Sequence, residues 1–142
     1  MTKIFIGSDH AGFELKSTIL DELLLEHDIT DFGTQSVDSV DYPLFAKQVA
    51  NGVLSNKDSF GILICSTGIG MSIAANRHRG IRAALCRAMK DVKLARHHNN
   101  ANVLALGATN TSTDEAIEMI KAFLTTTFDG GRHENRINQL DQ

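Results

Sequence analysis

The sequence predicts an α/β fold, a three-layer αβα sandwich in which helices enclose one parallel sheet on both faces. Short apolar runs typical of strands alternate along the chain with longer stretches whose apolar residues recur at helical spacing. The strand runs are apolar without interruption, as in Ile62 to Ile64, which indicates burial on both faces of a sheet. Regular alternation of this kind favours parallel strands joined by crossover helices.

Each element follows from its local pattern. Strands are expected at Lys3–Gly7, Ile29–Gly33, Ile62–Ile64, Ile81–Cys86 and Val103–Gly107. Helices are expected at Phe13–His27, at Leu44–Leu54 with Pro43 as the first helical residue, from Met71 to Ala75, at Met89–His97 and at Thr113–Thr126. An extra C-terminal helix, Arg132–Leu140, is expected after Gly130 and Gly131, outside the alternation.

Composition limits the classes of function. A chain of 142 residues with 42% hydrophobic residues fits a single domain, residues 1–142, with one core. A net charge of -3 argues against nucleic acid as a partner. No apolar run has membrane length and no leader segment precedes the first strand, so we expect no membrane partner and a cytoplasmic location. Two cysteines without a C-x-x-C pair fit free thiols in a reducing compartment.

The most informative stretch is the turn that follows the third strand. Cys65 ends the apolar run, and Ser66, Thr67, Gly68, Ile69 and Gly70 follow before the next helix. Backbone amides at such a turn point outward at a helix N-terminus, where they favour anions and the thiolate form of a cysteine. The alternative is that Cys65 is a small buried residue at a strand end, which is the common role of free cysteine.

A second polar loop, with Asp9 and His10, follows the first strand. Ligands of parallel sheets gather at the carboxyl ends of strands beside the switch point. If Asp9 and Cys65 serve one site, the first and third strands are neighbours, which favours a Rossmann-like sheet in the order 2-1-3-4-5. In that order Cys86, at the end of the fourth strand, lies near Cys65, and we expect it to have a packing role.

The sequence lacks the binding motifs of several cofactor classes. Gly7, Gly12, Gly68 and Gly70 do not form G-x-G-x-x-G, and Phe13-Glu14 stands where a phosphate loop needs Lys and Ser or Thr. The six histidines show no H-x-x-x-H spacing and no Cys/His cluster. We therefore expect no organic cofactor and no metal.

Further polar residues remain in the last third of the chain. Arg132 and Arg136 are four residues apart, so both guanidinium groups lie on one helix face and suit a phosphate dianion. His98 and Asn99 form a pair at the end of a predicted helix. The alternative interpretations are a solvated basic face for the arginines and a helix-end histidine favoured by the dipole.

Taken together, these motifs resemble the B-type ribose-5-phosphate isomerases, in the group that also includes galactose- and allose-6-phosphate isomerases. The matching segments are Gly7–Gly12, Asp41–Pro43, Ile64–Gly70, Ser72–Asn76, His98–Asn99, Asn102–Val103 and Gly130–His133. The presence of both Cys65 and His98 resembles the ribose-phosphate branch, since the galactose-phosphate subunits lack one or the other. Thr109 departs from the pattern, because many members carry arginine there.

The resemblance implies reversible conversion of ribose 5-phosphate to ribulose 5-phosphate through a cis-enediolate, in the non-oxidative pentose phosphate pathway, without cofactor. Cys65 would be the base, the amides of residues 66–70 the anion hole, and His98 the group that opens the sugar ring. Asp9 would assist or orient the sugar, and Thr67 belongs to the same catalytic set.

The implied substrate contacts come from both halves of the chain. His10, Arg132 and Arg136 would hold the phosphate, and Asn99 and Tyr42 would line the sugar pocket. The alternatives are an isomerase of allose or galactose 6-phosphate and a non-catalytic module that binds a sugar phosphate.

His98 precedes the fifth strand, whereas Cys65 follows the third, so the two are expected at opposite edges of the sheet. Strands of five or six residues separate these edges by about 17 to 20 Å. The sequence therefore predicts a homodimer with shared active sites, or a dimer of such dimers.

Overall fold

The computed structural model describes all 142 residues and confirms the α/β fold. The five parallel strands are β1 (Lys3–Ser8), β2 (Asp28–Asp31), β3 (Phe60–Cys65), β4 (Ala83–Leu85) and β5 (Val103–Gly107). Their order in the sheet is β2-β1-β3-β5-β4. No helix combines the length and the apolar character that a membrane crossing requires.

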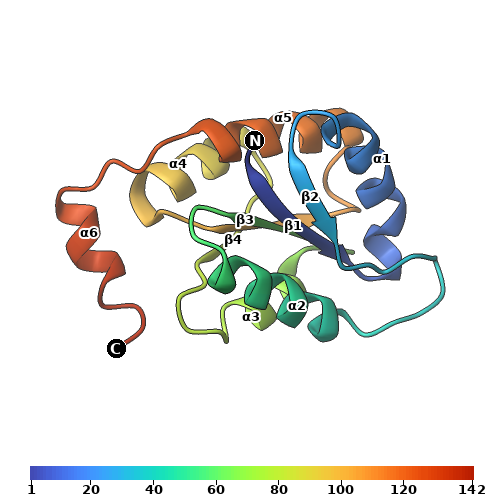
Figure 1. Cartoon of the computed structure of the whole chain (residues 1–142), viewed down its shortest axis with the longest axis horizontal. Coiled ribbons are helices and arrows are strands. Elements are labelled where there is room, and N and C mark those ends of the chain that lie inside the picture. Colours follow the sequence, from blue (N-terminus) through green and yellow to red (C-terminus); the bar gives the residue numbers. More distant parts are fainter.

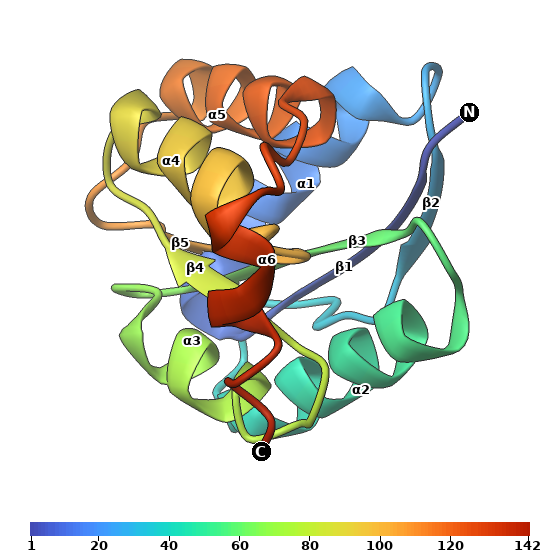
Figure 2. The ribbon, with the colours of Figure 1, turned by 90° about the vertical axis from the view of Figure 1, so that its left-hand side faces the viewer.

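Helices cover both faces of the sheet and a last helix stands apart (Figure 1). The elements are the 3-10 turn η1 (His10–Gly12) and the helices α1 (Phe13–Leu23), α2 (Tyr42–Ser55), α3 (Ile69–Ala75), α4 (Met89–Asn99), α5 (Thr113–Thr125) and α6 (Arg132–Ile137). Figure 2 shows α1, α4 and α5 on one face of the sheet and α2 and α3 on the other. Helix α6 lies beyond the sheet, and no residue in it is buried.

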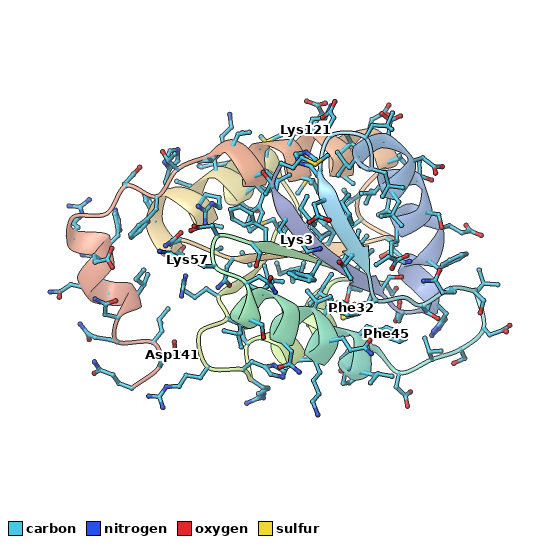
Figure 3. The ribbon with its side chains drawn as sticks, viewed as in Figure 1. Lys3, Phe32, Phe45, Lys57, Lys121 and Asp141 are labelled. Carbon is cyan, nitrogen blue, oxygen red and sulfur yellow. The ribbon has the colours of Figure 1, made fainter.

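The core has two parts because the sheet is apolar on both faces. Ile62, Ile64, Leu104 and Leu106 face α1, α4 and α5, and they belong to a cluster of 18 buried residues. Leu63, Val103 and Ala105 belong to a cluster of 13 on the side of α2 and α3, where Phe45 of α2 is also buried (Figure 3). Successive strand residues point to opposite faces, so uninterrupted apolar runs fill both clusters.

The predicted order 2-1-3-4-5 is wrong in its last two places. Strand β5 pairs with β3 in the register Gly61↔Val103 to Cys65↔Gly107, and β4 lies outside it at the edge. All five residues of β5 are buried, whereas the three residues of β4 are only partly buried. The more apolar strand therefore takes the inner position.

This order also corrects the position predicted for Cys86. Strand β5 separates β3 from β4, and Cys86 packs in the cluster on the α1, α4 and α5 side, whereas Cys65 packs in the other cluster. Cys86 is 1% exposed, which supports the packing role expected for it.

Several elements are shorter than predicted. Helix α1 ends at Leu23 instead of His27, since Leu24 and Leu25 face solvent and add nothing to the core. Helix α6 ends at Ile137 instead of Leu140, and it has no buried face whose packing would extend it. Strand β2 ends at Asp31, and β4 covers only the middle of its predicted span.

Candidate active site

The loop after β1 and the turn after β3 lie side by side at the carboxyl edge of the sheet. Residues Ser8 and Ile64 are paired across the two strands, and the Asp9 amide donates a hydrogen bond to the Ile64 carbonyl oxygen (3.2 Å). The Asp9 carboxylate accepts from the Gly12 amide (3.2 Å) and so caps η1. A Cβ atom at Gly12 would lie 2.6 Å from the Ile64 carbonyl oxygen, so glycine lets η1 reach the end of β3. Asp9 and Cys65 are therefore neighbours, as expected.

The turn that follows Cys65 presents unpaired amides. The amides of Ser66, Thr67, Gly68 and Gly70 donate no hydrogen bond within the chain, and the Ile69 amide donates only a long bond to Thr67 Oγ1 (3.3 Å). Gly68 has φ +80°, a left-handed conformation that lets the chain enter α3 directly. Ser66 and Thr67 are exposed while Cys65 is only 5% exposed, so the turn's unpaired amides follow directly on a thiol that is largely shielded from water.

Thr109 fastens this turn from the end of β5. Its hydroxyl group donates to the Ser66 carbonyl oxygen (2.7 Å), and its amide donates to the same oxygen (3.0 Å). The Cys65 carbonyl oxygen in turn accepts from the Ala108 amide (2.9 Å). The residue that departs from the family pattern therefore holds the turn in place through its hydroxyl group.

His10 and Tyr42 complete this edge. Nδ1 of His10 accepts a hydrogen bond from the Val40 amide (3.2 Å), which leaves Nε2 to carry the proton and to donate. Tyr42 begins α2, and its ring packs on Gly70, where a Cβ atom would lie 2.6 Å from Tyr42 Cζ. The structure thus brings Asp9, His10, Tyr42, Cys65 and the turn together.

The remaining predicted residues gather at the other end of the molecule. Because α4 runs back from β4 and ends just before β5, His98 and Asn99 lie at the amino edge of the sheet. Helix α6 packs against α4 there and carries Arg132 and Arg136, both exposed. Figure 1 shows α6 at the end of the molecule opposite the arrowheads of β1 and β2. One chain therefore does not bring His98 or the arginines to Cys65.

The two arginines of α6 have no charged partner in the chain. Neither Arg132 nor Arg136 takes part in an ion pair of the chain. Asn99 lines a cleft of about 380 Å³ together with Arg82, Leu140 and Asp141. The Asp141 carboxylate accepts from the Gly80 amide (3.0 Å), which ties the C-terminal segment to the loop before β4 (Figure 3).

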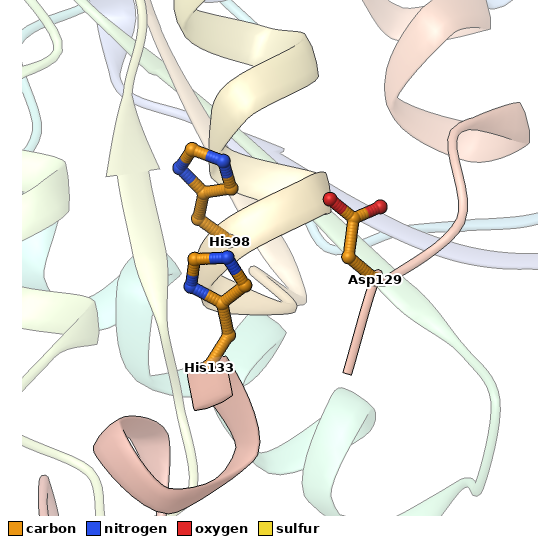
Figure 4. Close-up of side chains that lie close together, drawn as sticks. All are labelled: His98, Asp129 and His133. Atoms are coloured by element: carbon orange, nitrogen blue, oxygen red, sulfur yellow. The ribbon is translucent and has the colours of Figure 1, made fainter. Parts of the chain in front are cut away.

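His133, which no sequence pattern assigned to the site, stacks on His98. The ring centroids lie 4.4 Å apart and the ring planes differ by 13° (Figure 4). Desolvation lowers the pKa of His133 below its usual 6.5, and the positive charges of His98, Arg132 and Arg136 lower it further. The pairing of these rings depends on how the chain between α5 and α6 folds back, which has no local sequence signal.

Comparison with known proteins identifies the family. The model of the Ribose/Galactose Isomerase family matches residues 4–140. This chain belongs to that family. A curated relative, ribose-5-phosphate isomerase B of Escherichia coli K12, is 42% identical over 141 residues, with 99% of this chain and 95% of the relative covered.

Solved structures agree with this placement. A ribose 5-phosphate isomerase from Thermotoga maritima superposes with a TM-score of 0.96 at 53% identity, and the match covers 99% of this chain and 97% of the other. Ribose-5-phosphate isomerase B from Mycoplasma genitalium, solved with bound ribulose-5-phosphate, superposes with a TM-score of 0.93 at 42% identity and covers 98% and 93%. Both superpositions extend over nearly the whole chain.

Proposed function

We propose that the chain interconverts ribose 5-phosphate and ribulose 5-phosphate, an aldose-ketose isomerisation of the pentose phosphate pathway. The observation that carries the proposal is a shielded thiol, Cys65, beside a turn in which four of the five amides have no acceptor in the chain. Moving a proton between C2 and C1 requires one base and a site for the negative enediolate oxygen. The turn after β3 supplies both within a few residues.

The proton transfer is assigned to Cys65. As a thiolate, its Sγ removes the proton from C2, and as a thiol it returns the proton to C1. The amides of Ser66 to Gly70 donate to the enediolate oxygen, and Thr67 adds its hydroxyl group, since Thr67 Oγ1 receives only the long hydrogen bond from Ile69. No redox cofactor is needed, because C1 is reduced as C2 is oxidised within the same molecule and Cys65 carries the proton between them.

Ring opening requires a second acid and base, because the substrate is mainly a closed furanose. We assign this step to His98, whose exposed imidazole can exchange protons with the ring oxygen and the anomeric hydroxyl group. Asp9 orients the sugar next to Cys65. Asn99 and Tyr42 line the sugar, one from each end of the molecule.

The phosphate is assigned to Arg132, Arg136 and His10. The two guanidinium groups have no partners in the chain, and His10 can donate from Nε2. His10 lies with Cys65, whereas the arginines lie with His98. One substrate can reach all of them only if two chains meet.

We therefore propose a two-fold dimer in which each site combines Cys65 of one chain with His98, Arg132 and Arg136 of its partner. The β3–β5 register puts Cys65 beside Gly107 at one edge and Gly61 beside Val103 at the other. Strands of this length separate the edges by about 17 Å, beyond hydrogen-bond reach. Ile69 and Ile73 support the dimer, since both are about half exposed on α3 beside the turn.

The two free cysteines fit a reducing compartment, and we place the protein in the cytoplasm.

A direct assay tests the proposed function. The purified protein is incubated with ribose 5-phosphate, and ketose formation is followed, with allose 6-phosphate and galactose 6-phosphate in parallel. We expect the largest kcat/KM for ribose 5-phosphate. A larger value for either hexose phosphate would move the assignment to that substrate, and binding of all three without turnover would establish a binding module instead.

A further inference from the structure

Three side chains that can bind a metal converge where α4 meets α6. His98 comes from the last turn of α4, His133 from the first turn of α6, and Asp129 from the segment that joins α5 to α6 (Figure 4). Their candidate ligand atoms all lie within 4.8 Å of one another. Two imidazoles and a carboxylate are the ligand types found in three-residue zinc sites that keep a fourth position open.

The carboxylate at this cluster is held by a further histidine. His97 Nδ1 and Asp129 Oδ1 are 2.8 Å apart, and the Asp129 amide donates to the His97 carbonyl oxygen (3.0 Å). These two bonds fix Asp129 against the end of α4 and leave Oδ2 without a partner. Outer histidine-carboxylate contacts of this kind orient the ligands of metal sites.

The two stacked imidazole rings must reorient before the cluster can accept an ion. Ligand bonds to zinc of about 2.0 to 2.2 Å put neighbouring ligand atoms about 3.4 Å apart around a tetrahedron. Because Asp129 is held in place, the imidazoles of His98 and His133 must move to close the remaining gap of up to about 1.4 Å. The stacked rings must turn about χ2 so that one nitrogen of each faces the ion.

We propose that His98, His133 and Asp129 form a binding site for a divalent zinc-type cation, and that the bound ion inhibits the enzyme by occupying His98. Water fills the fourth position. Imidazole ligands favour Zn²⁺, Co²⁺, Ni²⁺ and Cu²⁺ over Mg²⁺ and Ca²⁺. The inhibition rests on the ring-opening role proposed for His98, whereas the binding does not.

The charges around the site indicate that substrate and metal ion compete for it. Arg132 and Arg136 lie on α6 beside the cluster and oppose a cation, whereas Glu134 partly offsets them. The same arginines are assigned to the substrate phosphate, and His98 to the sugar. Substrate and metal therefore compete, and ribose 5-phosphate should displace the ion.

Binding is measured on the full-length protein by titration with Co²⁺ in metal-free buffer, with visible absorption as the readout and Zn²⁺ as the displacing ion. We expect a saturable d–d band with one ion per chain, and loss of isomerase activity with the same concentration dependence. Asp129→Asn should weaken Co²⁺ and Zn²⁺ binding by about 10- to 100-fold, the range found when metal-site partners are removed. Without metal, Asp129→Asn should keep its isomerase activity.

Glu134→Gln is the matched control, because it makes the same change of charge close by, in the first turn of α6, but removes no ligand. It should leave the cobalt affinity within about threefold of the parent. Equal weakening by Asp129→Asn and Glu134→Gln would show a general charge effect and overturn the site. A sulfur-to-cobalt charge-transfer band would move the ion to Cys65, with the same consequence.

The outcomes separate this site from the proposed function. An active isomerase that shows no cobalt band and no zinc inhibition contradicts the metal site and leaves the function intact. A cobalt band in a protein without isomerase activity contradicts the function and leaves the site intact. A band at the cluster without loss of activity removes the inhibitory role of the ion.

Discussion

The two ends of the parallel strands are built in contrasting ways. At the carboxyl edge, Asp9 and Cys65 are buried, and hydrogen bonds from Asp9, Thr109 and Ala108 fix the loops to one another. At the other end, α6 has no buried residue, and its two arginines have no partner in the chain. The first region is preorganised for chemistry within one chain. The second carries exposed charges that are free to bind a ligand or a second chain.

The largest effect on activity is expected at the carboxyl edge of the sheet. Cys65→Ala should lower kcat by about 10²- to 10⁴-fold, the usual contribution of a positioned acid or base. Substrate binding and the fold should be kept, because only a small side chain is lost. Cys86→Ala is the control and should keep activity, since Cys86 packs in the other cluster. Activity of Cys65→Ala within about tenfold of the parent, less than about 1.4 kcal/mol, would contradict the role of Cys65.

Substitutions on α6 should affect substrate binding more than the chemical step. Arg136→Ala removes a charged hydrogen bond worth about 1.5 to 3 kcal/mol, which corresponds to about 10- to 100-fold in Kd for ribose 5-phosphate. Calorimetry in the Cys65→Ala background measures this without turnover. Lys93→Ala, which makes the same charge change on α4, should bind normally. If Arg136→Ala also binds normally, the arginine pair is an ordinary basic face.

A smaller effect tests how the turn is held. Thr109→Val removes the hydroxyl bond to Ser66 but keeps the amide bond, at a cost of about 1 kcal/mol. We expect kcat to fall about fivefold, because that energy now opposes the active geometry of the turn. Thr109→Ser retains the hydroxyl group and should stay close to the parent. A Thr109→Val enzyme as fast as Thr109→Ser would show that this bond does not position the turn.

The last effect concerns stability at high pH and lies away from the site. Burial, with a further contribution from Asp91, raises the pKa of Cys86 from 9.0 to about 12. Between these values the unfolded chain releases the proton and the folded chain keeps it, so stability falls as pH rises through this range. Cys86→Ala should show a shallower fall in urea midpoint over the same range. Parallel pH curves for the two proteins would contradict the raised pKa.

The sequence predicts the carboxyl edge of the sheet, with Asp9 and Cys65, better than the opposite end, with α6, for physical reasons. Uninterrupted apolar runs identify buried strands, and the polar residues that follow them lie at the sheet edge by geometry. The order of β4 and β5 was predicted wrongly because it depends on which strand is buried more completely, and both runs look apolar. His98, Asp129 and His133 meet through a connection that turns at Gly130 and Gly131, with φ values of +70° and +57°. No periodicity signals that contact.

Subunit mixing tests the central claim, that the two regions act together across a dimer. Cys65→Ala and His98→Asn, each inactive alone, are combined under conditions that allow subunit exchange, and exchange is verified independently. Statistical exchange makes half of the dimers mixed, and each mixed dimer has one intact site, so about a quarter of the parental activity should return. Verified exchange with no recovery would contradict the shared site and leave His98 outside the reaction of Cys65.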